Sequence, residues 1–190
     1  MLDVRKSTEI FVPAEARTEF SLTSADLLLL HQELPEIFKE IANPIQNKIP
    51  PIGATWQRTI EFYLKREGAV SVPVTIKKPR PSIDTTQLFQ RITRQEFELL
   101  QHGFNGFAPT YPLGDLSDTK LFVQYYGVQA EPPEGMTYFD LKHTFQEYLA
   151  SLGLGVTDFP NNAIYTEHGW LLFDVEDVRP INKAQYNLAP

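Results

Sequence analysis

Regular alternation of apolar and polar residues between positions 58 and 77 is the clearest structural pattern in this chain. Two alternating runs, 58–65 and 70–77, flank the turn Arg66-Glu67-Gly68. Successive side chains of a β-strand point to opposite faces of its sheet, so this spacing is typical of two strands with one buried face. The pattern predicts an antiparallel hairpin, with Tyr63, Thr75 and Lys77 on its more polar face and Lys77 at the end of its second strand.

Several apolar runs at helical spacing follow residues that commonly begin a helix. These capping residues are Thr23-Ser24, Asp84-Thr85, Thr93 with Glu96, and Thr137 with Asp140. Pro35 suits the first turn of a second short helix, and Gly103 and Gly153 stand where glycine commonly ends one. Lys120 to Tyr126 is predicted as a further strand, after a polar turn at residues 115–118.

These elements predict an α+β fold in which antiparallel strand hairpins pack with a few helices. We expect one folded unit with a helical N-terminal segment and linker at residues 1–53, an α+β core at 54–180 and a C-terminal tail at 181–190. Asn43–Gly53 contains three prolines, which is typical of a linker or crossover loop.

The composition narrows the classes of function. The 190 residues carry a net charge of -7, and the one basic cluster is Lys77-Lys78-Pro79-Arg80, so a surface for nucleic acid or anionic membrane is not expected. The absence of cysteine excludes disulfides and thiolate chemistry and fits a reducing compartment. There is no apolar run long enough to span a bilayer and no secretory pattern. We therefore expect a cytoplasmic protein.

The stretch from Leu152 to Pro180 contains the highest density of residues that could take part in catalysis or metal binding. Two short apolar segments, 163–165 and 170–173, flank Glu167-His168-Gly169 and predict a hairpin that holds Asn162 and Asp174 at the same open end. An amide and a carboxylate that face each other suit a divalent cation such as Mg²⁺, which takes oxygen ligands. The alternative is a surface hairpin with a solvated acidic end.

The order of these elements resembles the protein-kinase-like fold, especially its atypical, aminoglycoside-phosphotransferase-like branches. VPVTIK, ending at Lys77, is similar to the strand whose lysine holds nucleotide phosphates, and the following helix, with Glu96 or Glu98, to the one whose glutamate pairs with that lysine. KLFVQYYG resembles the strand before the interlobe hinge, GVQAEPPEG the hinge, and FDLKHTFQEYLASLG the long helix before the catalytic loop. The resemblance covers residues 55–180 and implies a reduced two-lobe arrangement.

This resemblance implies a role for each of five residues. Lys77 and Glu96 would position the nucleotide, Asp158 would orient the acceptor hydroxyl as the catalytic residue, and Asn162 and Asp174 would hold the metal. The implied cofactors are ATP and Mg²⁺.

The motifs also differ from those of active kinases. Val156-Thr157-Asp158 replaces His-Arg-Asp, and Asp158 precedes Asn162 by four residues where the family usually has five. Asp174 is followed by Val-Glu and not by Phe-Gly, and the turn that would cover the phosphates has one glycine, Gly68. The resemblance therefore leaves two versions open, a small atypical phosphotransferase and a catalytically inactive pseudokinase.

Two other classes of function compete with this resemblance. A non-catalytic protein-interaction or immunity-type module would bind another protein through an acidic, aromatic surface. The candidate residues for it are Tyr111, Tyr125, Tyr126, Tyr138, Trp170, Glu131, Glu134, Asp174, Glu176 and Asp177. A metal-dependent hydrolase would combine His168 with the last three of these carboxylates, although a single histidine lacks the repeated spacing of zinc sites.

Overall fold

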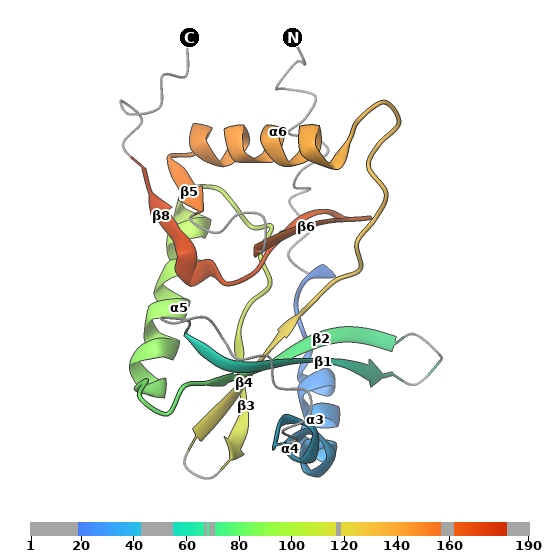
Figure 1. The fold of residues 1–190 in the computed structure, drawn as a ribbon, viewed down its shortest axis with the longest axis vertical. Coiled ribbons are helices and arrows are strands. Elements are labelled where there is room, and N and C mark those ends of the chain that lie inside the picture. The colour runs from blue at the N-terminus through green and yellow to red at the C-terminus, as the bar shows by residue number, and fades with distance from the viewer. Residues whose placement is uncertain are drawn as a thin grey trace. The chain divides into compact units, whose positions relative to one another are not determined.

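The computed structural model describes residues 19–42, 55–66, 68, 71–116, 119–156 and 162–181. The predicted linker at 43–53, Asp158 and the tail after residue 181 lie outside these ranges. The described chain has the predicted α+β architecture with antiparallel strand hairpins (Figure 1). None of its helices combines the length and the apolar content needed to cross a membrane.

The described residues form two compact units. We call residues 21–91 and 109–127 the sheet unit, and residues 19–20, 92–108 and 128–181 the hairpin unit. The predicted domain boundaries at residues 53 and 180 stay predictions.

The sheet unit contains a four-stranded antiparallel sheet in the order β1-β2-β4-β3. Its strands are β1 (Trp56–Lys65), β2 (Ser71–Pro79), β3 (Tyr111–Leu116) and β4 (Thr119–Tyr125). The predicted hairpin is confirmed, because β1 pairs with β2 from Trp56↔Pro79 to Lys65↔Ser71. The predicted end of its second strand is wrong: β2 continues to Pro79, so Lys77 lies inside the strand.

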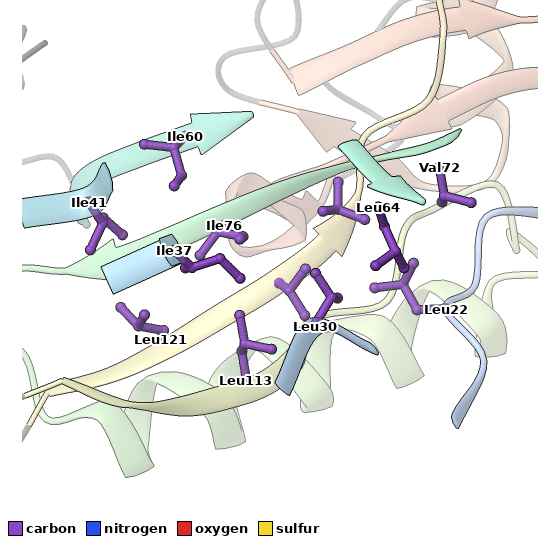
Figure 2. Close-up of a cluster of buried hydrophobic side chains, with 12 residues drawn as sticks. Leu22, Leu30, Ile37, Ile41, Ile60, Leu64, Val72, Ile76, Leu113 and Leu121 are labelled. Carbon is purple, nitrogen blue, oxygen red and sulfur yellow. The ribbon is translucent and has the colours of Figure 1, made fainter. Parts of the chain in front are cut away.

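Helices α3 (Ser24–Gln32) and α4 (Leu34–Ala42) cover one face of this sheet. Thr23 caps α3 as predicted, because its hydroxyl accepts a hydrogen bond from the backbone N–H of Asp26. Figure 2 shows apolar side chains of the helices and strands pointing toward one another in the core. The fully or almost fully buried members of this core include Leu30, Ile37, Ile41, Val74, Ile76, Leu113, Leu121 and Val123.

Strand β3 was not predicted from the sequence. Pro112 and Gly114 interrupt its apolar pattern, and its pairing with β4 shifts register between these two residues. Proline lacks a backbone donor and is tolerated in an edge strand or at a bulge. Since β3 is the outer strand beside β4, both exceptions apply here.

Helix α5 (Thr85–Gln101) is one continuous helix. Asp84 begins it, because its Oδ1 accepts hydrogen bonds from the backbone N–H groups of Thr86 and Gln87 at 2.9 and 3.0 Å. The second predicted helix start, at Thr93, is wrong, because Thr93 lies within the helix. Gly103, with a φ of +80°, follows the helix end as predicted. Residues 85–91 of α5 belong to the sheet unit and residues 92–101 to the hairpin unit.

The hairpin unit combines α6 (Tyr138–Ser151), capped by Thr137 as predicted, with two pairs of short strands and one short 3-10 helix. These segments are β5 (Leu154–Val156) paired with β8 (Val178–Pro180), β6 (Ala163–Thr166) paired with β7 (Gly169–Leu172), and η2 (Val175–Asp177) between β7 and β8. The Phe145 ring of α6 stacks on Trp170 of β7, with 4.6 Å between ring centroids and 6° between planes. This stack joins the long helix to the hairpin.

Residues 106–108 pair with β7 along its free side. The backbone N–H of Leu172 donates to the carbonyl of Gly106 at 2.9 Å, and that of Ala108 donates to the carbonyl of Leu172 at 3.1 Å. A Cβ at position 106 would lie 2.8 Å from the carbonyl oxygen of Trp170, too close for any other residue without a shift of the backbone. Glycine therefore permits this close approach to the hairpin.

Candidate functional site

The β6–β7 hairpin brings two predicted site residues to one end. Its pairs run from Thr166↔Gly169 to Ala163↔Leu172, and the backbone N–H of Phe173 donates to the carbonyl of Asn162 at 2.8 Å. Asn162 and Phe173 therefore face each other as the next pair, and Asp174 follows directly. The predicted hairpin is confirmed, and so is the position of Asn162 and Asp174 at its open end.

Asp174 has an unusual backbone conformation. Its φ and ψ are both 50°. Within the described ranges, Asp174 is the one non-glycine residue with a positive φ. The left-handed region costs a residue with a Cβ about 1 kcal/mol or more, although aspartate and asparagine tolerate it better than most. Such strain tends to persist where function requires it. The bend turns the chain from β7 into η2, where the backbone N–H of Asp177 donates to the carbonyl of Asp174 at 2.9 Å.

The side chain of Asn162 is buried, with 5% of its surface exposed. Its Nδ2 donates to Oδ2 of Asp177 at 2.8 Å. The amide nitrogen is directed to Asp177, and the amide oxygen is the atom of this side chain whose chemistry suits a metal ion. Asp177 was assigned from the sequence to an acidic surface, and the structure makes it the partner of Asn162.

Gln95 of α5 binds the backbone around η2, the turn that carries the carboxylates of Glu176 and Asp177. Its Nε2 donates to the backbone carbonyls of Glu176 and Val178, at 3.2 and 3.4 Å. These bonds satisfy backbone groups on both sides of Asp177. The sequence did not indicate this contact, because its partners are separated by about eighty positions along the chain.

Lys77 lies on the face of the sheet opposite α3 and α4, where 3% of its surface is exposed. It pairs with Thr59 of β1 and Phe122 of β4. Its ammonium lies 5.1 Å from the centre of the Trp56 ring, a cation–π distance. Lysine is rarely this buried, so its position is a specific feature of the sheet unit.

A pocket of 410 Å³ opens on the sheet unit beside this polar face. The residues that line it are Glu40, Thr59, Ile60, Glu61, Thr75 and Tyr126. Thr75 lies two residues before Lys77 on the same face, is 9% exposed, and has a buried hydroxyl without a hydrogen-bond partner. A buried hydroxyl left unpaired costs about 1–3 kcal/mol. A ligand that supplied the missing partner would recover part of this cost.

Tyr126 and Glu61 form a polar pair at the same pocket. Burial raises the pKa of Tyr126, and the charge of Glu61, the neighbouring Tyr63 and a hydrogen bond with Glu61 raise it further. The hydroxyl of Tyr126 therefore remains a donor to the Glu61 carboxylate at neutral pH.

Glu96, Glu98 and Asp158 are the remaining predicted site residues. Glu96 is half-buried on the part of α5 that belongs to the hairpin unit, together with Asn162 and Asp174, whereas Lys77 belongs to the sheet unit. Glu98 is bound by Arg94 at 3.1 Å on the helix surface. Asp158 lies outside the described residues. The functional roles of all five predicted residues stay predictions.

The hydrolase alternative requires His168 to join the carboxylates after β7. His168 lies instead beside Glu167 at 3.3 Å and Glu19 at 3.9 Å. In the part of the chain that the structure describes, no three side chains of the His, Cys, Asp or Glu type gather as a metal-binding group.

Comparisons with known proteins do not assign this chain to a family. No family model and no curated protein matches the sequence. Any functional conclusion therefore depends on the residues themselves.

Proposed function

We propose that this protein binds a nucleotide together with Mg²⁺ in a kinase-like manner, as a small atypical phosphotransferase or as a catalytically inactive pseudokinase. One observation carries the proposal: at the open end of the β6–β7 hairpin, the buried amide of Asn162 is bound to Asp177 beside the strained Asp174. A solvated surface hairpin requires neither the buried amide nor the strained backbone.

The donor set at this hairpin suits Mg²⁺. Mg²⁺ takes carboxylate and amide oxygens and keeps several waters, so one or two protein ligands suffice. Asn162 would supply its amide oxygen and Asp174 its carboxylate, while the hydrogen bond from Asn162 to Asp177 would fix the orientation of the amide. The segment Asp174–Val178 contains three carboxylates and no basic residue, which favours a cation there. When bound, Mg²⁺ would neutralise charge on the nucleotide phosphates.

The sheet unit contains a cation and a pocket, and Thr59 and Thr75 of that pocket lie on the same face of the sheet as Lys77. Lys77 carries an ammonium whose movement is limited by packing on Trp56. A positioned cation binds phosphate oxygens at little cost in side-chain entropy, because much of that cost has been met during folding. The pocket at Thr75, whose volume is 410 Å³, is large enough for a nucleobase.

Replacing Asp174 by asparagine tests the metal site. Asparagine tolerates the left-handed backbone but removes the charge. We expect ATP with Mg²⁺, at 100 times the dissociation constant, to stabilise the wild-type protein by about 2.7 kcal/mol, which raises its melting temperature by several degrees. In Asp174→Asn the shift should fall to the value measured with ATP and EDTA. Asp115→Asn, an exposed site on β3, should keep the full shift.

The same measurement separates nucleotide binding from the interaction module. If millimolar ATP with Mg²⁺ leaves the melting temperature of the wild-type protein unchanged, the proposal is wrong and the interaction module becomes the better account. Trp170 could not anchor a partner in that case, because it is fully buried. The exposed apolar side chains of the hairpin unit include Val128 and Phe139, with 65% and 79% of their surfaces exposed, and these would be the first residues to replace.

Replacing Asp158 by asparagine distinguishes the two versions of the proposal. In a phosphotransferase, loss of the residue that orients the acceptor hydroxyl should lower the rate of ADP formation by about a hundredfold or more, while the ATP-dependent melting shift remains. In a pseudokinase, neither the wild-type protein nor Asp158→Asn should form ADP above the rate of a protein-free control. ADP release measured in both proteins under the same conditions gives the answer.

A further inference from the structure

The residues that line the pocket of the sheet unit differ in the hydrogen bonds they can make. Thr75 offers a buried hydroxyl without a partner, and a hydroxyl can donate or accept. Glu61 offers a carboxylate, which accepts only. The pairing of Glu61 with Thr75 across β1 and β2 places both side chains on the same face of the sheet as neighbours.

The polar environment of this pocket favours a ligand group that donates hydrogen bonds. Glu40 and Glu61 are both lining residues, and neither lysine nor arginine is among them. Tyr126 already donates to Glu61, but a carboxylate has about four acceptor positions. Glu61 therefore keeps the capacity to accept a bond from a ligand, and a ligand that presents an oxygen there would be repelled.

We propose that Glu61 is the specificity-determining residue of this pocket and selects a 6-amino purine over a 6-oxo purine, while Thr75 contributes affinity without selecting between them. The inference rests on the proposed nucleotide binding. The 6-amino group of adenine is a donor to the Glu61 carboxylate, whereas the 6-oxo group of hypoxanthine presents an acceptor at the same place. The hydroxyl of Thr75 adapts to either base, because it rotates to donate or to accept.

Titration calorimetry with ADP and with inosine diphosphate, both with Mg²⁺, tests the assignment. We expect wild-type protein to bind ADP at least about tenfold more tightly, the usual effect of losing one hydrogen bond to a charged group. In Glu61→Gln the two affinities should become nearly equal, chiefly because inosine diphosphate binds better: glutamine can donate to the 6-oxo group. In Thr75→Val both affinities should fall by about tenfold, with their ratio unchanged.

Two exposed replacements are matched controls. Glu36→Gln and Thr93→Val repeat the same chemical changes at exposed positions outside the pocket, and both should bind like the wild-type protein. Glu61 is itself exposed, so its replacement leaves the buried core intact, and urea denaturation of each variant verifies folding.

The possible outcomes separate the two proposals. If wild-type protein binds ADP and Glu61→Gln keeps the wild-type ratio of affinities, the assignment of Glu61 is overturned and nucleotide binding stands. The same holds if Glu61→Gln weakens both nucleotides equally. If neither nucleotide binds to the wild-type protein, the proposed function fails and the assignment fails with it.

Discussion

Replacing Asp26 by asparagine is expected to lower the free energy of unfolding of the sheet unit by about 2–3 kcal/mol. Asp26 is 1% exposed. Its carboxylate accepts bonds from Nε and Nη2 of Arg66, both at 2.7 Å, and from the backbone N–H and hydroxyl of Thr23, both at 2.8 Å. Asparagine replaces one acceptor oxygen by a donor, which leaves buried donors without partners. Arg66 is 42% exposed, so water limits the loss.

Urea denaturation followed by tryptophan fluorescence measures this loss. The chain has two tryptophans, so in a Trp170→Phe background the signal comes from Trp56 of the sheet unit. Glu36→Gln is the control, because its ion pair with Lys39 is exposed and should contribute less than about 0.5 kcal/mol. Equal losses in the two variants would show that the pair of Asp26 and Arg66 does not stabilise the sheet unit.

The same residue predicts a pH dependence of stability. Burial alone would raise the pKa of Asp26, but hydrogen bonds from Arg66 and Thr23 outweigh it, so the folded-state pKa lies below the ordinary value of 3.8. The unfolded chain then binds protons more readily than the folded one. This contribution is present above about pH 4 and is lost as the pH falls through the folded-state pKa. Asp26→Asn should flatten the stability profile in that range.

Replacing Trp170 by alanine is expected to destabilise the hairpin unit by about 3–5 kcal/mol. Trp170 is fully buried, stacks on Phe145 at 4.6 Å and meets the edge of Tyr165 at 5.7 Å. Its removal leaves a large cavity between α6 and β7. Because only Phe173 separates β7 from Asp174, the variant should also lose the Mg²⁺-dependent part of the ATP shift, even at temperatures where it remains folded.

Phe139→Ala is the matched control for Trp170→Ala. Phe139 is an aromatic residue of α6 with 79% of its surface exposed, so its loss should change the free energy of unfolding by less than about 0.5 kcal/mol. Circular dichroism in urea measures both variants. Nearly equal losses would contradict the central place of Trp170 in the hairpin unit.

Much of the fold follows from local sequence patterns. The alternation in β1 and β2 and the capping residues Thr23 and Thr137 act over a few positions, and the structure confirms them. The capping pattern at Thr93 failed because the helix begins earlier, at Asp84, and residues 85–101 contain neither glycine nor proline to interrupt it. Strand β3 could not be predicted, because its place at the sheet edge is a property of the tertiary fold.

Local sequence patterns likewise predicted some features of the candidate site, whereas others depend on the tertiary fold. The sequence placed Asn162 and Asp174 at one hairpin end, because a short turn fixes the register of its strands. The bond from Asn162 to Asp177 depends on the left-handed turn at Asp174, which no local pattern indicated. The sequence also placed Thr75 on the polar face of β2, but burial of its hydroxyl depends on neighbouring strands.

Titration calorimetry of ATP into the wild-type protein, with Mg²⁺ and again with EDTA, tests nucleotide and metal binding most directly. We predict saturable binding of one nucleotide per chain with Mg²⁺, weakened by about tenfold or more with EDTA. Absence of binding at millimolar ATP would contradict a metal site at the end of the β6–β7 hairpin. So would binding that is as strong with EDTA, or in Asp174→Asn with Mg²⁺, as it is in the wild-type protein with Mg²⁺.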